Sequence, residues 1–353
     1  MESKPHHRLA AGARRRLLTL GLTIALVATA AVSASAAPPG RVGGVILDGL
    51  LRAGITKPAP VSPLSTMKLY VEPGGSAQQQ ADVWSGSRPD DATLIERIAR
   101  QPQALWLGEW RADVRATVAR RVAKARAAGR VPVLVAYNIP NRDCGQHSSG
   151  GLATAEAYRA WIGRVADGIG DSPAVVIVEP DALAGFDCLS KEQRDERTGL
   201  IQYAVQRLSA HPAAAVYIDA GNARWVPAAT IARRLRAAGV AQARGFSVNV
   251  AGFETTSRSR AYGRAISRRT GGAHFVIDTS RNGAGPAGPG EWCNPAGRAL
   301  GEFPTAQTGD PLVDALLWVK RPGESDGQCN GGPPAGTWWP DYALDLARRA
   351  AGL

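Results

Sequence analysis

Seven short runs of apolar, β-forming residues recur along the chain. They cover residues 67–72, 132–137, 174–179, 214–219, 245–250, 273–278 and 315–320. Longer stretches with helical spacing lie between and after them, near residues 93–102, 112–129, 154–169, 191–209, 227–238, 258–270 and 340–350. Strands that alternate with helices, and that are apolar along their whole length, predict a parallel sheet covered by helices.

Seven such units in one domain favour a closed or nearly closed β/α barrel over an open, doubly wound sheet. The doubly wound alternative is weakened further because no glycine-rich dinucleotide-binding fingerprint follows the first strand. We therefore predict an α/β fold with a seven-stranded parallel barrel. In a barrel of this kind the active site lies at the carboxyl ends of the strands.

The first 36 residues predict a secretion signal. Three arginines at positions 14–16 precede an apolar run over residues 17–32, and small residues lead up to Ala36. The apolar run is shorter than the roughly 18 residues that favour a permanent transmembrane helix, so we expect export and cleavage near Ala36. Retention as a membrane anchor, and the choice between the general and the twin-arginine export routes, stay open.

Residues 37–63 are rich in proline and glycine and predict a linker or an extended arm, which leaves residues 64–353 as one large domain. The chain carries a formal net charge of +12, and the leader holds five basic residues against one acidic residue, so about +8 remains after cleavage. Much of the arginine falls in alanine-rich helical stretches such as residues 111–130 and predicts solvated helix surface. The sequence shows neither basic residues interleaved with aromatic residues nor a known nucleic-acid-binding module, so we expect no nucleic-acid partner.

Four cysteines, none of them in a CxxC pair, predict two disulfides in an exported protein. Three pairings are possible, and pairing of sequence neighbours is the simplest of them. The cysteines are Cys144, Cys188, Cys293 and Cys329. The three histidines of the mature chain lack ligand spacing to another His or Cys, so we expect no metal and no cofactor.

Charged side chains follow the predicted strands at the ends where a barrel places its active site. The acidic ones are Asp143, Glu179, Asp181, Asp219, Asp278, Glu324 and Asp326, and the basic ones are Arg142, Arg281 and Lys320. Such a cluster fits glycoside hydrolysis, in which a protonated carboxylic acid donates to the leaving oxygen while a carboxylate assists water or attacks the sugar. Nine tryptophans in a chain with 6% aromatic residues favour this chemistry, because flat indole rings stack on sugar rings.

Each acidic position also has a simpler explanation. A single aspartate at the start of a loop is most often a helix cap or a turn residue, and this interpretation suffices for Asp278. Trp318, which lies inside a predicted strand, is explained equally well as a core residue. We further hypothesise that Arg281 keeps Asp326 ionised through a salt bridge, since both residues follow neighbouring strands.

Six ordered sequence blocks resemble those of glycoside hydrolase family 6, the inverting cellulases. The blocks are YNIPNRDCGQHSSGG, VIVEPDALA, YIDAGNARW, GFSVNVAGF, EWCN and WVKRPGESDG, and the similarity spans roughly residues 65–350. The resemblance implies a distorted seven-stranded α/β barrel, in agreement with the strand count. It also implies that Cys144 pairs with Cys188 and that Cys293 pairs with Cys329.

Roles follow from the resemblance position by position. Asp181 matches the general acid, and Asp143 matches the aspartate that raises the pKa of this acid, since two nearby carboxylates resist joint ionisation. Asp326 matches the residue proposed as base, although the proton can instead leave through a water chain near Ser149 and Asp143. The residues that match sugar-binding positions are Trp106, Tyr137, Ser149, Asp219, Trp225, Asn249, Trp292, Lys320 and Glu324.

The chain departs from the family pattern in three places. Asn222 stands where many members have histidine, and Ala228 lies near the position of a second tryptophan found in some cellobiohydrolases. The segments between the paired cysteines are also short, which favours an open cleft and internal cleavage of the polymer.

The sequence therefore predicts a secreted, inverting endo-β-1,4-glucanase that acts as a monomer on β-1,4-glucan, with no cofactor and no stable membrane partner. Within the same family a cellobiohydrolase is the alternative. A catalytically inactive β-glucan-binding protein and a metal-dependent deacetylase or phosphatase are the alternatives outside it.

Overall fold

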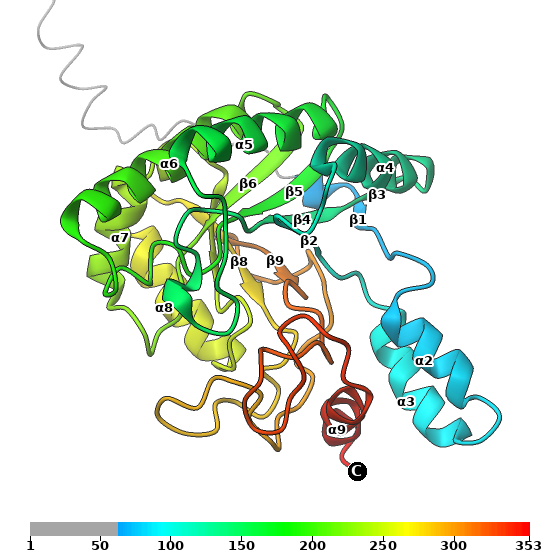
Figure 1. Cartoon of the computed structure of the whole chain (residues 1–353). Helices are drawn as coiled ribbons and strands as arrows, with labels where there is room; N and C mark the ends of the chain where they lie inside the picture. The colour runs from blue at the N-terminus through cyan, green and yellow to red at the C-terminus, as the bar shows by residue number, and fades with distance from the viewer. Residues whose placement is uncertain (1–62) are drawn as a thin grey trace, which may run out of the picture. The chain divides into compact units, whose positions relative to one another are not determined.

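The computed structural model describes residues 63–353, and its centre is a seven-stranded parallel sheet (Figure 1). The strands lie in the order β2 (Leu105–Leu107), β4 (Val133–Ala136), β5 (Ala174–Val178), β6 (Ala214–Asp219), β7 (Gly245–Val248), β8 (His274–Asp278) and β9 (Val313–Leu317). The helices are α2 (Ser76–Trp84), α3 (Pro89–Ala99), α4 (Val114–Ala127), α5 (Ala155–Ile169), α6 (Lys191–Ser209), α7 (Ala228–Ala237), α8 (Thr256–Ser267) and α9 (Pro340–Ala350). Within the described residues, no helix has both the length and the apolar character needed to cross a bilayer.

The first strand of the sheet differs from the predicted one. In the predicted strand 67–72, only Lys68–Leu69 (β1) forms ladder pairs, and they pair with Arg130–Val131 (β3) in a separate two-stranded sheet. The edge of the main sheet is instead β2, a three-residue strand that pairs with β4. A run as short as Leu-Trp-Leu carries too little periodicity to be recognised, and its place is set by pairing with a distant strand.

The sheet curls until its two edges, β2 and β9, approach each other. The backbone N–H of Ala104 donates to the carbonyl of Trp318 at 3.2 Å, and the indole N–H of Trp106 donates to the carbonyl of Val319 at 2.8 Å. These two hydrogen bonds join the edges where no regular ladder forms. The predicted distorted seven-stranded barrel is therefore confirmed.

Strand β5 shows why the barrel strands are apolar along their whole length. Val176 and Val178 point outward into the cluster shared with the helices, whereas Val175 and Ile177 point into the barrel interior. All four side chains are fully buried. A strand buried on both faces has no solvent-facing side, so the sequence shows no alternation of apolar and polar residues.

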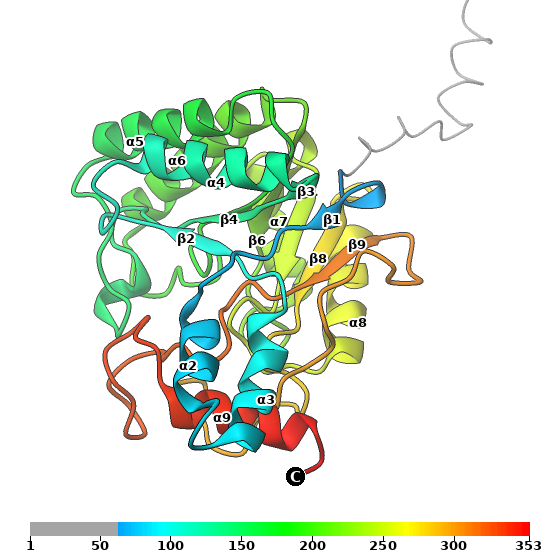
Figure 2. The same cartoon turned by 90° about the vertical axis from the view of Figure 1, so that its right-hand side faces the viewer.

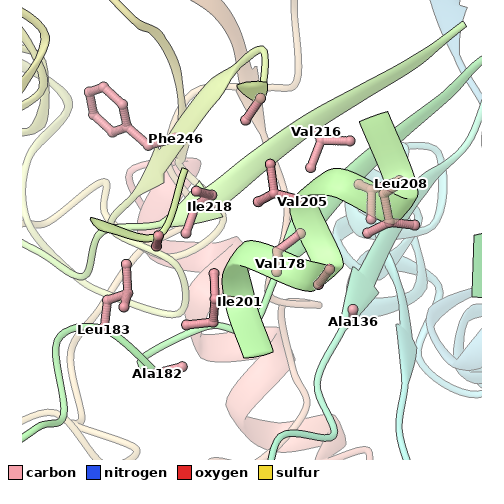
Figure 3. Packing of buried hydrophobic residues seen from close by; sticks show 14 of the residues in the cluster. Ala136, Val178, Ala182, Leu183, Ile201, Val205, Leu208, Val216, Ile218 and Phe246 are labelled. Atoms are coloured by element: carbon pink, nitrogen blue, oxygen red, sulfur yellow. The ribbon is translucent and has the colours of Figure 1, made fainter. Parts of the chain in front are cut away.

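The outer face of the sheet packs against the helices. Ile201, Val205 and Leu208 of α6 lie over Val178 and Val216 of the neighbouring strands (Figure 3). All five are fully buried. Burying an aliphatic side chain of this size contributes about 1.5–3 kcal/mol, so this layer fixes α6 on the sheet and fixes the strand ends that carry the site.

Helices α2, α3 and α9 form a separate layer, which Figure 2 shows below the sheet. Ile95 and Ile98 of α3 share a buried cluster with Tyr342 and Leu346 of α9. Because α9 follows the last loops of the barrel, this packing anchors the chain on both sides of those loops.

Candidate active site

Asp181 lies on a sharply turned loop that follows β5. Glu179 and Asp181 both adopt left-handed backbone conformations, with φ of 48° and 69°. The buried Glu179 carboxylate accepts hydrogen bonds from the backbone N–H groups of Asn138 and Ile139, at 3.0–3.1 Å. Asp219, at the end of β6, accepts the backbone N–H of Asp181 at 3.0 Å. The two carboxylates on either side of this loop therefore hold its strained backbone in place.

The surroundings of Asp181 favour its protonated form. Burial raises the pKa of Asp181 well above its ordinary value, and the nearby negative charges of Asp219, Asp143 and Asp326 raise it further. Burial also raises the pKa of Asp219 to about 6. A carboxyl group that keeps its proton near neutral pH is suited to donate it to a leaving group.

Asp143 lies at the start of the loop that follows β4. One of its oxygens, Oδ2, accepts hydrogen bonds from both the backbone N–H and the hydroxyl of Ser148, each at 2.8 Å. The hydroxyl of Tyr137 lies 3.0 Å from that of Ser148. Ser149 is exposed, and its carbonyl accepts from the guanidinium of Arg142 at 3.2 Å. The serine bonded to Asp143 is thus Ser148, which the sequence did not single out because two adjacent serines carry the same signal.

Arg142 holds the rest of this loop in place through hydrogen bonds to its carbonyl groups. Its buried guanidinium donates to the carbonyls of Ser148 and Tyr137, both at 2.8 Å. It also forms a bidentate salt bridge with Glu109, at 2.7 and 2.8 Å. A guanidinium with several fixed partners is a rigid support, so the loop has one well-defined path.

Asp326, in the loop after β9, is surrounded by positive charge. Its carboxylate accepts from Arg281 at 2.8 Å and from the backbone N–H of Asn294 at 3.0 Å, and Lys320 lies 3.1 Å away. Burial alone would raise its pKa, but the charges of Arg281 and Lys320 outweigh this effect and lower the pKa of Asp326 to about 2. The predicted salt bridge between Arg281 and Asp326 is confirmed, and Asp326 is ionised at any ordinary pH.

Both disulfides pair sequence neighbours, as expected from the resemblance. Cys144 is joined to Cys188, with Cα atoms 6.0 Å apart, and Cys293 is joined to Cys329, with Cα atoms 6.2 Å apart. The first disulfide links the loop that begins with Asp143 to the loop that carries Asp181. The loops that carry Asp143 and Asp181 are therefore joined covalently.

Three tryptophans were predicted to bind sugar. Trp225 and Trp292 are 41% and 46% exposed, which suits stacking on a pyranose ring. Trp106 is half-buried and meets Tyr137 edge to face, with ring centroids 5.0 Å apart. Trp318, which lies inside a predicted strand, is 1% exposed and belongs to the core, in agreement with the simpler explanation.

Asp219 and Asn249, two further residues that match sugar-binding positions, are both buried. Asp219 is fully buried, and besides Asp181 it accepts from Ser247 at 3.0 Å. Asn249 is 1% exposed, donates to the carbonyl of Asp278 at 2.9 Å and accepts from the backbone N–H of Glu254 at 3.0 Å. In this structure both side chains support neighbouring backbone, and their contact with sugar stays a prediction.

Lys320 and Glu324, the remaining predicted sugar contacts, lie beside Asp326. The ammonium group of Lys320 donates to the carbonyl of Ser325 at 3.1 Å in addition to its ion pair. Glu324 pairs with Arg321 at 2.5 Å, and burial raises its pKa. Both side chains are largely buried, so any contact with a ligand would use the little surface that remains.

Together these features define a class of protein. A parallel β/α barrel whose mouth combines an aspartic acid with a raised pKa, an ionised aspartate and exposed indole rings has the composition of a glycoside hydrolase site. The family model for glycosyl hydrolases family 6 matches residues 64–350, and the chain belongs to this family. The predicted family resemblance is confirmed.

Similar proteins carry names consistent with this membership. Endoglucanase A of Cellulomonas fimi is 48% identical over 291 residues, which cover 82% of this chain and 62% of that protein. Endoglucanase 1 of Streptomyces halstedii is 43% identical over 303 residues, which cover 82% of this chain and 92% of the relative. The solved structure of the endoglucanase Cel6 from Mycobacterium tuberculosis, in complex with methyl-cellobiosyl-4-deoxy-4-thio-β-D-cellobioside, is 51% identical with a TM-score of 0.78, and the match covers 83% of this chain and all of that one.

Proposed function

We propose that this protein is an endo-β-1,4-glucanase that hydrolyses internal bonds of cellulose or related β-glucans with inversion at the anomeric carbon. The observation that carries the proposal is that the pKa values of two carboxyl groups at one site are shifted in opposite directions. Burial and neighbouring charge raise the pKa of Asp181, whereas Arg281 and Lys320 lower that of Asp326 to about 2. Glycoside hydrolysis requires this division between an acid that holds its proton and an anion that does not.

In the proposed reaction Asp181 protonates the glycosidic oxygen as the bond breaks. Positive charge then develops on the sugar ring, and the fixed negative charge of Asp326 stabilises it. Water attacks from the opposite face, and its proton must pass to a base. The negative charge of Asp143 contributes to keeping Asp181 protonated in the free enzyme.

The contacts of Asp326 bear on the identity of that base. A general base works best with a pKa near the operating pH, and the pKa of Asp326 is about 2 because both of its neighbours Arg281 and Lys320 are cations. We therefore favour proton transfer through water toward Asp143, beside the hydroxyl of Ser148. Asp326 then acts by charge, and the predicted Ser149 contributes through its backbone.

We assign substrate binding to two exposed tryptophans and to less exposed residues beside the catalytic loops. Trp225 and Trp292 are proposed as stacking platforms, and Tyr137, beside the Asp143 loop, as the group against the sugar at the cleavage point. Trp106, Lys320 and Glu324 complete the proposed sugar-binding set. The relatives named endoglucanase, at 43–48% identity, support internal cleavage over release of cellobiose from chain ends.

The expected chain organisation accompanies this proposal. Residues 1–36 and most of residues 37–63 lie outside the described part of the chain, so the secretion signal, its cleavage near Ala36 and the arm remain predictions. We propose residues 64–353 as the catalytic domain of a secreted, monomeric enzyme that has no stable membrane partner after cleavage.

Asp181→Asn tests the proposal, with Asp187→Asn as a matched control on the exposed part of the same loop. Initial rates on barley β-glucan and the loss of viscosity of carboxymethylcellulose would be measured for both. We expect the initial rate to fall by about 10²- to 10⁴-fold in Asp181→Asn and to stay unchanged in the control. Proton NMR of early products should show the α-anomer. Cellobiose as sole product with a slow viscosity loss would contradict internal cleavage, and a β-anomer would contradict inversion.

A further inference from the structure

Glu254 is a buried carboxylate to which the proposed reaction gives no role. It lies between β7 and α8 and is 3% exposed. Two arginines form ion pairs with it: Nε of Arg224 lies 2.6 Å from one carboxylate oxygen, and Nε of Arg258 lies 3.0 Å from the other. No other group in the described part of the chain donates a hydrogen bond to these two oxygens. Since a buried charge is costly unless it is paired, Glu254 and the two arginines constrain each other's positions.

The backbone of Glu254 is itself held in place. Its N–H donates to the side-chain oxygen of Asn249 at 3.0 Å. Its carbonyl accepts from the side-chain amides of Asn249 at 3.2 Å and of Asn282 at 2.9 Å. Both asparagines are buried. The carboxylate of Glu254 therefore extends from a fixed point of the scaffold and can anchor a more exposed side chain.

One of the two arginines directly precedes a proposed sugar-binding residue. Arg224 is followed by Trp225 in the loop between β6 and α7. The next residue, Val226, is held as well, because its carbonyl accepts from the hydroxyl of Tyr262 on α8 at 2.6 Å. The chain is therefore fixed on both sides of Trp225, on one side by an ion pair and on the other by a hydrogen bond.

The indole ring of Trp225 rests against the loop that carries the acid. A side-chain carbon added at Gly185 or at Gly221 would lie 3.5 Å from atoms of this ring, so the ring packs over two residues that have no side chain. The N–H of Gly185 donates to the carbonyl of Asp181 at 2.7 Å. Since the ring contacts the loop of the acid, any shift of the Trp225 backbone would change the position of the ring relative to Asp181.

A simpler role for Glu254 is to stabilise α8. Glu254 directly precedes Thr255, the N-cap residue of this helix, and negative charge near a helix N-terminus is favourable. This role would depend on Arg258, in the first turn of α8, at least as much as on Arg224. The two roles of Glu254 therefore differ in which of the two arginines affects glucan binding.

We propose that Glu254 is a positioning residue for Trp225: through its ion pair with Arg224 it holds the indole ring in the place where a glucan ring stacks on it. The inference rests on the proposed glucanase function, in which Trp225 is a stacking platform. Neither Glu254 nor Arg224 takes part in the proton transfers of the proposed reaction. Loss of the ion pair therefore weakens glucan binding and leaves the chemical step unchanged.

The test measures kcat and KM on barley β-glucan for Glu254→Gln and Arg224→Ala. Arg258→Ala is the matched control, because Arg258 pairs with the same carboxylate and its side chain is 54% exposed, against 40% for Arg224. We expect KM to rise by about threefold to tenfold in Glu254→Gln and in Arg224→Ala, as loss of one aromatic contact allows, with kcat unchanged. Arg258→Ala should leave both constants unchanged.

These substitutions are compatible with folding. Glu254→Gln removes a buried charge, and both arginines that lose their partner are partly exposed to water. Arg224→Ala leaves Glu254 paired with Arg258. An unchanged kcat in these variants would show that the catalytic centre is intact, so a rise in KM then reports weaker binding.

A double-mutant cycle tests whether Glu254 acts through Trp225. Trp225→Ala alone should raise KM, because it removes the stacking platform. Adding Glu254→Gln to Trp225→Ala should raise KM no further, since the ring that Glu254 positions is already absent.

The outcomes separate this inference from the proposed function. An unchanged KM in Glu254→Gln, Arg224→Ala or Trp225→Ala would overturn the positioning role and leave the glucanase function intact. The same holds for an equal rise of KM in Arg258→Ala, for a fall in kcat without a rise in KM, and for a further rise when Glu254→Gln is added to Trp225→Ala. Wild-type protein without activity on β-glucan would overturn both proposals.

Discussion

The buried ion pair of Asp326 makes a quantitative prediction about stability and pH. Asp326→Asn removes a carboxylate that is bonded to Arg281 at 2.8 Å, and both side chains are almost fully buried. At pH 6 the substitution leaves the charge of Arg281 with no carboxylate at this position. Breaking a buried pair in this way costs about 3–5 kcal/mol, so the free energy of unfolding of the variant should fall by about this amount.

Part of this difference should depend on pH. The pKa of Asp326 is about 2 in the folded protein, against 3.8 for an ordinary aspartate. A lowered folded-state pKa stabilises the protein fully at pH values above the unfolded pKa, and this stabilisation is lost as the pH falls through the folded pKa. It amounts to about 2 kcal/mol at pH 6, of which about half remains at pH 3. The difference between wild type and Asp326→Asn should therefore shrink by about 1 kcal/mol from pH 6 to pH 3.

Urea unfolding followed by tryptophan fluorescence at pH 6, 5, 4 and 3, with both disulfides oxidised, gives the required free energies. Asp195→Asn is a suitable control, because Asp195 pairs with Lys191 on the surface of α6 and its side chain is 67% exposed. Exposed ion pairs contribute about 0–1 kcal/mol to the free energy of unfolding, so this control should change it little. A difference between wild type and Asp326→Asn that stays constant over this pH range would refute the reasoning that Arg281 and Lys320 lower the pKa of Asp326.

Three further predictions concern other parts of the molecule. In the proposed mechanism the protonated form of Asp181 is the active one, so activity should fall as the pH rises through the pKa of Asp181. Asp219→Asn removes a negative charge that raises this pKa, and it should therefore move the alkaline limb of the kcat/KM profile to lower pH. An unmoved limb would contradict the role of Asp219. Ile201→Ala should lower the free energy of unfolding by about 2–5 kcal/mol, measured in urea, because it opens a cavity beneath α6. Replacing Cys144 and Cys188 by serine should lower the free energy of unfolding by about 3–4 kcal/mol. A decrease below about 1 kcal/mol would contradict a stabilising role for this disulfide.

The fold could be predicted from the sequence in most of its parts. Strand β5 can be recognised directly from its apolar run in the sequence, since a strand buried on both faces must be apolar throughout. Strand β2 could not be found in this way. Its three residues form a strand because they pair with β4 and meet β9 at the barrel seam, and neither contact is local in sequence.

The sequence alone determined which residue types gather at the barrel mouth, because parallel strands bring their carboxyl ends to one edge. It also led to the family and to the pairing of the cysteines. Tertiary structure decided what each residue does there. Asp219, Asn249 and Trp225 all come from the sequence blocks that carry the family resemblance, yet Asp219 and Asn249 are buried whereas Trp225 is 41% exposed. The pKa shifts of Asp181 and Asp326 depend on groups such as Asp219 and Arg281, which lie 38 and 45 residues away along the chain and which only folding brings close.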